Sequence, residues 1–388
     1  MKKLLFSIGV VVMLIMLSLT LSATASAETY GDLTYEKNDC VITITDCDES
    51  VISVDIPAEI DGCPVITIGY RAFDNCEKLE SINIPNSIKK IDHLAFVSCK
   101  MLSDINIPDS VTSIGAFAFS NTAFFNNSDN WENDVLYINN HLIEAKDDIT
   151  GIYEIKAGTI TIGGQAFSDS CYLEGVIIPD SVLTIGDTAF CFCESLKSIT
   201  IPDSVIEIEK AAFDCCLNLE NIKIGKNVKK IGADAFSCCW KLESVELPDG
   251  IEVIDGAFSG SGVKSISLPD SITRLGEYAF GDCSRLESII IPDNVTEIGA
   301  CAFSQCTSLE SITIYNPECS ISFSVDTIPE ATVIYGHINS TAQMYAMAYG
   351  RKFVPIEESY RFVYKIAEFF NMIILMFKNV FDKIFGLI

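Results

Sequence analysis

Sixteen cysteines are the side chains of this sequence best suited to chemistry, because thiolates form disulfides and bind soft metal ions. Seven of them occupy one repeated position, three residues after a phenylalanine: Cys76, Cys99, Cys193, Cys216, Cys239, Cys283 and Cys306. A repeated position implies a repeated environment. We therefore expect these thiols to be small, buried hydrophobic groups with a weak S–H donor, most of them unpaired.

Three further cysteines, Cys191, Cys215 and Cys238, lie outside that position and are expected to face outward. If successive units stack about 4.8 Å apart, Cys215 and Cys238 come within disulfide range, although side chains that point in parallel disfavour the bond. The cysteine spacing does not match a zinc finger, so a zinc site is not expected. We expect no metal and no cofactor, and whether any cysteines pair is left open.

Glutamates form a second repeated set, seven residues after the same phenylalanines, with serines directly beside them. The glutamate column comprises Glu80, Glu174, Glu220, Glu243, Glu287 and Glu310, and the serine column comprises Ser81, Ser198, Ser244, Ser288 and Ser311. Stacked carboxylates could bind Ca²⁺ or a basic protein surface. A solvated face that protects the sheet is the favoured alternative, because no compact calcium-binding loop occurs.

Catalytic motifs are missing from the sequence. It contains no Gly-x-Ser-x-Gly nucleophile turn, phosphate-binding loop, HExxH helix or dinucleotide fingerprint. Three histidines leave little material for acid–base catalysis near neutral pH. The net charge of −27 repels phosphate backbones, so nucleic acid is not an expected partner. We expect a protein that is not an enzyme.

The segments that position these side chains repeat every 22 or 23 residues. An Ala-Phe pair recurs with its phenylalanine at positions 73, 96, 119, 167, 190, 213, 236, 258, 280 and 303. The single gap of 48 residues equals two units plus two residues. Within a unit, Leu follows six residues after the Phe and Ile or Val nine residues after it, and a Pro-Asp-Ser turn or a near relative comes next. A fixed internal period of this length is typical of a solenoid.

Each unit contains a short strand, because Leu-x-x-Ile-x-Ile places its isoleucines on one face by the two-residue strand period. Pro-Asp-Ser then ends the strand in a turn. A unit of 23 residues cannot bury its apolar face alone, so neighbouring units must stack with their strands in parallel. The expected fold is a β-rich, right-handed solenoid of about ten to eleven coils of 22–23 residues around one continuous apolar interior.

The unit from Ile291 to Ile312 (Ile-Pro-Asp-Asn-Val-Thr-Glu-Ile-Gly-Ala-Cys-Ala-Phe-Ser-Gln-Cys-Thr-Ser-Leu-Glu-Ser-Ile) resembles the repeat of the BspA-like leucine-rich repeat family. The resemblance covers about residues 52–315. It implies a secreted or cell-surface protein of leucine-rich-repeat type that adheres to host proteins or to other cells. A shared fold does not by itself fix a function, so this role is an expectation.

Two segments depart from the repeat. Residues 28–51 contain two alternating runs around Asn38-Asp39, which predict a hairpin that caps the first coil. An insertion at about residues 121–148 contains Asn139-Asn140 between two apolar runs, which predicts a second hairpin. Insertions in repeat proteins often bind ligands, so Trp131 and Tyr137 are candidate contacts; the alternative is that this hairpin only replaces a coil.

The two ends of the chain carry their own signals. Two lysines, an apolar run and Ala25-Ser26-Ala27 predict a signal peptide over residues 1–27, cleaved near Ala27, with a membrane anchor as the alternative. Residues 316–357 are expected to form a C-terminal cap with a short helix that ends at Gly350.

Residues 358–388 predict an amphipathic helical tail whose longest uncharged run is too short to span a bilayer. This tail could contact a membrane or envelope surface peripherally, pack on the end of the solenoid, or self-associate. Its apolar face comprises Phe362, Ile366, Phe369, Phe370, Ile373, Phe377 and Phe381.

Together these patterns favour a non-catalytic, secreted or surface-associated repeat protein that binds an extracellular protein or glycan and mediates adhesion. The alternative is an envelope-associated scaffold, anchored or oligomerised through the C-terminal helix. The candidate contact residues of the leading interpretation are Trp131, Tyr137, Glu220, Glu243, Glu287 and Glu310.

Overall fold

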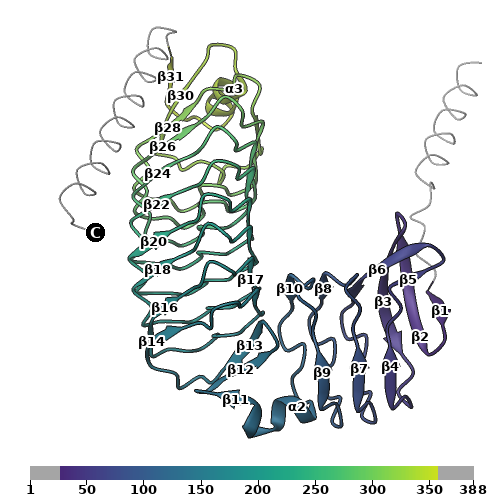
Figure 1. Cartoon of the computed structure of the whole chain (residues 1–388). Coiled ribbons are helices and arrows are strands. Elements are labelled where there is room, and N and C mark those ends of the chain that lie inside the picture. The colour runs from purple at the N-terminus through teal and green to yellow at the C-terminus, as the bar shows by residue number, and fades with distance from the viewer. Residues whose placement is uncertain (1–26, 357–388) are drawn as a thin grey trace, which may run out of the picture. The chain divides into compact units, whose positions relative to one another are not determined.

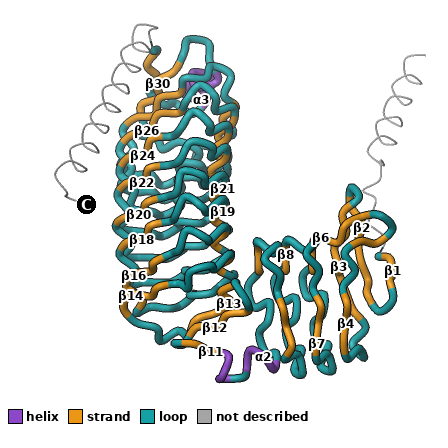
Figure 2. The backbone as a smooth tube through the Cα atoms, in the orientation of Figure 1, coloured by secondary structure: helices purple, strands orange, loops and turns teal. Residues whose placement is uncertain are grey.

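The computed structural model describes residues 27–356 of the chain, and these form two compact units, with the division in the chain between Asn130 and Trp131. Short strands joined by loops make up nearly all of both units (Figures 1 and 2). The expected signal peptide and amphipathic tail fall on residues 1–26 and 357–388, outside the described part, and stay predictions. No helix within residues 27–356 has both the length and the hydropathy needed to span a bilayer.

The first unit begins with a hairpin that leads into a parallel ladder. The antiparallel strands β1 (Glu28–Tyr30), β2 (Leu33–Asn38) and β3 (Val41–Cys47) are followed by β4 (Ser53–Asp55), β5 (Glu59–Ile60), β6 (Cys63–Ile68), β7 (Ser81–Asn83), β8 (Lys90–Ile91), β9 (Asp104–Asn106) and β10 (Ser113–Ile114). One sheet runs β1-β2-β3-β6-β8-β10, with β5 beside β6, and a second runs β4-β7-β9. The unit ends in helix α2 (Ala123–Asn126) and the 3₁₀ turn η1 (Ser128–Asn130).

The second unit begins with the antiparallel strands β11 (Trp131–Glu132), β12 (Val135–Ile138) and β13 (His141–Ala145). Two-residue strands then line one side of its coils: β15 (Thr161–Ile162), β17 (Thr184–Ile185), β19 (Glu207–Ile208), β21 (Lys230–Ile231), β23 (Val253–Ile254), β25 (Arg274–Leu275), β27 (Glu297–Ile298) and β29 (Ser320–Ile321). This side forms the sheets β11-β12-β13-β15-β17-β19-β21 and β23-β25-β27-β29.

Longer parallel strands line the other side of the second unit (Figure 1). They are β14 (Gly151–Glu154), β16 (Leu173–Ile177), β18 (Ser198–Thr200), β20 (Asn221–Lys223), β22 (Ser244–Glu246), β24 (Ser265–Ser267), β26 (Ser288–Ile291), β28 (Ser311–Ile314), β30 (Val333–Gly336) and β31 (Phe353–Pro355). Their order in the sheets follows their order in the chain, as a solenoid requires. Helix α3 (Thr341–Ala348) lies between the last two strands in sequence.

The recurring phenylalanines stack inside each unit. All ten side chains are fully buried. Neighbouring rings stack with centroids 4.9–5.7 Å apart, from Phe73 to Phe119 in the first unit and from Phe167 to Phe303 in the second. Backbone bonds hold the same register, since the Phe190 N–H donates to the Ala212 carbonyl of the next coil at 2.7 Å. The expected stacking of coils is confirmed.

The expected number of coils was too low, and the phenylalanine stack is seen within each unit. The chain divides within the stretch that lacks an Ala-Phe pair, and the hairpin β12–β13 opens the second unit. The fold has about 14 turns, against the ten to eleven expected. The difference arises because β3, β13, β30 and β31 extend the parallel ladders without carrying the repeat motif.

A left-handed backbone position lies two residues before and two residues after each stacked phenylalanine. Around Phe213 these are Ala211 (φ 51°) and Cys215 (φ 57°). The cost of this conformation for a residue with a Cβ is about 1 kcal/mol, and it is offset by ladder bonds to the next coil, such as Cys215 N–H to the Ser237 carbonyl at 2.9 Å. Two fixed columns of residues therefore flank the phenylalanine stack.

The repeated thiols are buried and free, as expected. Six of them donate to the carbonyl of the phenylalanine one coil earlier, at 2.9–3.2 Å: Cys99, Cys193, Cys216, Cys239, Cys283 and Cys306. Burial is the main cause that raises the pKa of Cys99 to about 12, so this thiol is protonated at neutral pH. The repeated cysteine thus links coils through a weak donor without forming a covalent bond.

Two cysteine findings go beyond the expectation or correct it. Cys40 and Cys63 form a disulfide between the start of β3 and the start of β6, with 5.0 Å between their Cα atoms. It ties the capping hairpin to the first coil. Cys191 was expected to face outward but is buried, because it lies directly after the stacked Phe190 and burial again raises the pKa of its thiol to about 12.

Candidate binding surface

The strand face of the second unit is the outer side of β14 to β30, and it is exposed to solvent along its length. Its central column is Ile152, Gly175, Ser198, Asn221, Ser244, Ser265, Ser288 and Ser311. The strand register sets these residues opposite one another, as in the pairs Ser244–Ser265 and Ser288–Ser311. Small side chains leave the strand backbone open to close approach. Most parallel sheets are covered on both faces, whereas no element within residues 27–356 covers this one, so the face stands out as a surface for a partner.

A column of charged residues runs beside the serines, one residue earlier in each coil: Glu174, Lys197, Glu220, Glu243, Lys264, Glu287 and Glu310. Two lysines interrupt the glutamates, so the expected stack of carboxylates is not continuous. The lysines pair with glutamates one coil earlier, Lys197 with Glu174 at 3.0 Å and Lys264 with Glu243 at 2.9 Å. This arrangement argues against a row of Ca²⁺ sites, because much of the charge is already paired.

The four candidate glutamates fall into two classes. Glu220 pairs with Lys241 at 3.7 Å, and Glu243 also pairs with Arg285 at 2.6 Å. Hydrogen bonds from Lys264 and Arg285 lower the pKa of Glu243. Glu287 and Glu310 are exposed neighbours joined by a 2.9 Å backbone bond between their coils, and within residues 27–356 we find no ion pair for either. These two carboxylates are the more open to a basic partner.

The insertion hairpin places its two candidate residues differently. Trp131 is partly exposed at the start of β11, with the Lys146 ammonium 5.8 Å from its ring centroid. Tyr137 is buried, its hydroxyl lies 3.2 Å from that of Tyr153, and Lys156 lies 4.3 Å from its ring. Burial raises the pKa of Tyr137 far above its usual value. Tyr137 therefore packs in the core, because both faces of β12 are covered.

Two exposed apolar side chains lie at the start of the strand face and were missed from the sequence. Ile152 on β14 is 71% exposed and Ile177 on β16 is 54% exposed. Gly175 pairs with Ile152, and a Cβ at this glycine would lie 3.4 Å from the isoleucine Cγ1. The sequence could have revealed Ile177 by comparison with the equivalent positions of the next two coils. Those positions carry the polar residues Thr200 and Lys223, so an isoleucine stands out there.

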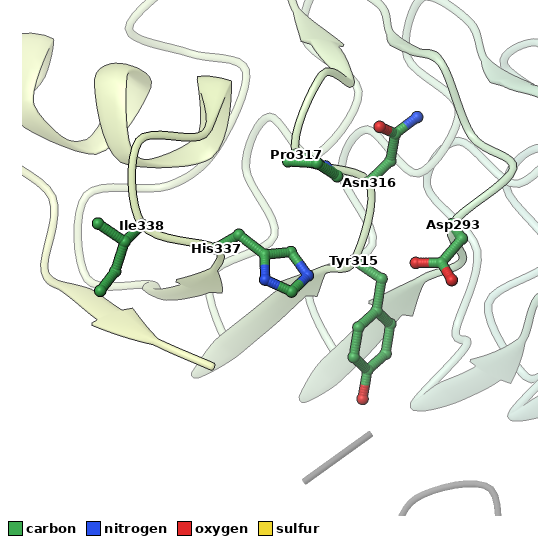
Figure 3. A pocket seen from close by; sticks show the side chains of 6 residues that line it. All are labelled: Asp293, Tyr315, Asn316, Pro317, His337 and Ile338. Carbon is green, nitrogen blue, oxygen red and sulfur yellow. The ribbon is translucent and has the colours of Figure 1, made fainter. Parts of the chain in front are cut away.

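A shallow pocket of about 490 Å³ lies at the other end of the strand face (Figure 3). It forms where three adjacent strands end, since Asp293, Tyr315 and His337 follow β26, β28 and β30 within one or two residues. Asn316, Pro317 and Ile338 complete its lining. The lining offers a carboxylate, a phenol and an imidazole as polar contacts, which extend the surface that a bound partner could touch.

A family model described as the BspA-type leucine-rich repeat region matches this chain in six copies. The matches cover residues 47–173, 160–284 and 252–329, which is most of the described chain. They include every coil with a stacked phenylalanine. No curated protein sequence matches the chain significantly.

The chain is similar to several solved bacterial structures. A leucine-rich repeat protein from Bacteroides ovatus is 25% identical, with 85% of this chain and 100% of that one covered and a TM-score of 0.39. A leucine-rich cell surface protein from Faecalibacterium prausnitzii is 22% identical over 87% and 97%, with a TM-score of 0.30. The pneumococcal vaccine antigen PcpA is 19% identical over 86% and 99%, with a TM-score of 0.38.

Proposed function

This chain belongs to the BspA-type leucine-rich repeat family, and from that premise we propose that it is a non-catalytic adhesion protein of the cell surface or exterior. Its strand face would bind an extracellular protein partner. The observation that carries the proposal is the uncovered parallel strand face, with its column of small polar side chains from Ser198 to Ser311. Repeat proteins commonly use such extended faces for binding.

The chemistry of this face favours a partner with basic side chains. The chain carries a net charge of −27, which attracts cationic surfaces over a distance of about one Debye length. Glu287 and Glu310 supply local carboxylates near one end of the face. Ile152 and Ile177 supply exposed apolar area near the other end, where a partner can gain affinity by burying it.

Blocking the strand face tests the proposal. Residues 28–356 are screened against an array of purified extracellular-matrix proteins and, in parallel, against a glycan array. We expect a protein partner whose binding weakens with added salt. The double variant Ser244→Tyr/Ser265→Tyr, which places bulk at the centre of the face, should weaken that binding at least about 10-fold, or about 1.4 kcal/mol.

The matched control is Ser284→Tyr/Ser308→Tyr, the same change at two exposed residues in the loops before the strands. It should leave affinity within about twofold. Equal weakening by both double variants would place the contact elsewhere. Negative results on both arrays would contradict the adhesion proposal, and binding to glycans alone would replace the protein partner with a carbohydrate.

A further inference from the structure

One cluster of metal-ligating side chains lies away from the strand face. Asp214, Cys215 and Cys238 come from two neighbouring coils of the second unit, and each is partly exposed. One ligand atom from each, a carboxylate oxygen and two sulfurs, lies within 4.8 Å of the others. The Cys215 Sγ is 3.5 Å from the Asp214 Oδ1. The cysteine spacing in the sequence showed no sign of a zinc site, because such sites are recognised by Cys-x-x-Cys loops. This cluster instead combines residues of two neighbouring coils.

The backbone fixes both thiols. Cys215 and Cys238 each follow a stacked phenylalanine by two residues and hold left-handed φ angles of 57° and 54°. Their N–H groups donate to Ser237 and Ser259 in the next coils at 2.9 and 2.8 Å. The two side chains therefore leave equivalent positions of adjacent coils in the same direction. A tetrahedral zinc ion with Zn–S bonds of about 2.3 Å holds two sulfurs about 3.8 Å apart, so only a small closure of the cluster is needed.

The neighbouring coils leave space beside the thiols. The equivalent position of the following coil is Gly260, where even a Cβ would lie 3.4 Å from the Cys238 Sγ. Gly260 itself contributes no side chain on that side of the cluster. On the other side the equivalent residue is Phe192, whose side chain is 44% exposed. A water molecule can thus complete a four-coordinate site.

The charges around the cluster suit a cation. The Asp214 Oδ1 lies 3.5 Å from the Cys215 Sγ, so a carboxylate stands directly beside the thiols. A bound cation replaces the thiol protons and neutralises this carboxylate. Thiolate ligands select zinc over hard ions such as Ca²⁺ or Mg²⁺.

We propose that Asp214, Cys215 and Cys238 bind one zinc ion, with water as the fourth ligand. Binding replaces waters of the hydrated ion with two Zn–S bonds and one Zn–O bond to Asp214, keeps one water as the fourth ligand, and releases the two thiol protons to solvent. The site spans two coils, so the bound ion would link them at the surface. The repeated thiols of the interior, in contrast, stay buried and free.

The test uses the reduced full chain with Co²⁺ and Zn²⁺ chloride as probes. We expect one Co²⁺ per chain with the near-ultraviolet charge-transfer band of cobalt–thiolate bonds, displaced by one equivalent of Zn²⁺. Cys215→Ser and Cys238→Ser should each weaken Zn²⁺ binding about 100-fold or more, and Asp214→Asn about 10-fold. Far-ultraviolet circular dichroism checks that each variant is folded.

The control is Cys301→Ser, which removes another partly exposed free thiol in a different coil. It should leave both the stoichiometry and the affinity unchanged. A cobalt band that survives in Cys215→Ser and Cys238→Ser, or no stoichiometric binding by the folded reduced chain, would overturn the proposal. A Cys215–Cys238 disulfide found by mass spectrometry, together with no metal binding after reduction, would overturn it in favour of a redox-active pair.

Discussion

Replacing Phe213 with alanine is expected to lower the free energy of unfolding of the second unit by about 3–5 kcal/mol. Phe213 is fully buried and stacks between Phe190 at 5.1 Å and Phe236 at 5.5 Å. The substitution removes both ring contacts and leaves a cavity that the fixed backbone of two coils cannot close. Denaturant titration followed by circular dichroism measures the change. Since domains are stable by only about 5–15 kcal/mol, the effect is large enough to populate unfolded chains.

The chain offers a matched control at Phe192. This residue lies two positions after Phe190, but its side chain is 44% exposed. The Phe192→Ala variant loses no stacked partner in the interior, so its stability should stay within about 0.5 kcal/mol of the parent. Equal losses in the two variants would mean that the phenylalanine stack has no special part in stability.

The second large effect concerns the carboxyl group of Glu144 on β13. Burial, and secondarily the charge of Asp147, raise the pKa of Glu144 from 4.5 to about 7. At a pH between these two pKa values, Glu144 is therefore protonated in the folded chain and ionised in the unfolded chain. This contribution to stability is fully present below about pH 4.5 and is lost as the pH rises through 7. The shift corresponds to about 3 kcal/mol.

The Glu144→Gln variant has no carboxyl proton to lose. Relative to the parent it should gain stability as the pH rises, by up to about 3 kcal/mol at pH 8, with little difference at pH 4. Unfolding titrations at both pH values measure this. Glu154→Gln on β14, the next strand along the chain, where the side chain is exposed, is the control and should show no such trend. A difference between parent and Glu144→Gln that does not depend on pH would contradict the assignment.

The repeat was readable from the sequence because its physical causes are local. The Ala-Phe spacing predicted the stack from Phe167 to Phe303, and the repeated cysteine position predicted buried free thiols. Each of these two predictions depends on one repeated position per coil. Because the coils stack, the residue at that position has the same neighbours in every coil. The same logic predicted the column of serines on the strands.

Features that join different coils were not readable in this way. The disulfide from Cys40 to Cys63 joins a capping strand to a coil, and Cys40 lies outside the repeat. Tyr137 was a candidate contact of the insertion hairpin, yet β12 is covered on both faces. The pairing of Glu243 with Arg285 crosses two coils, 42 residues apart in sequence. Each of these depends on the angle at which one coil lies on the next.

The central claim is that the coils of the second unit are stable only against one another, through the buried phenylalanine stack. Hydrogen exchange of the phenylalanine amides tests this most directly, because the N–H groups of Phe190, Phe213 and Phe236 each donate to an alanine carbonyl of the next coil at 2.7–2.8 Å. We expect slow exchange of all three amides with one shared free energy of opening, which Phe213→Ala lowers for all three together. Three unrelated exchange rates, or a loss of protection confined to residue 213 in that variant, would contradict it.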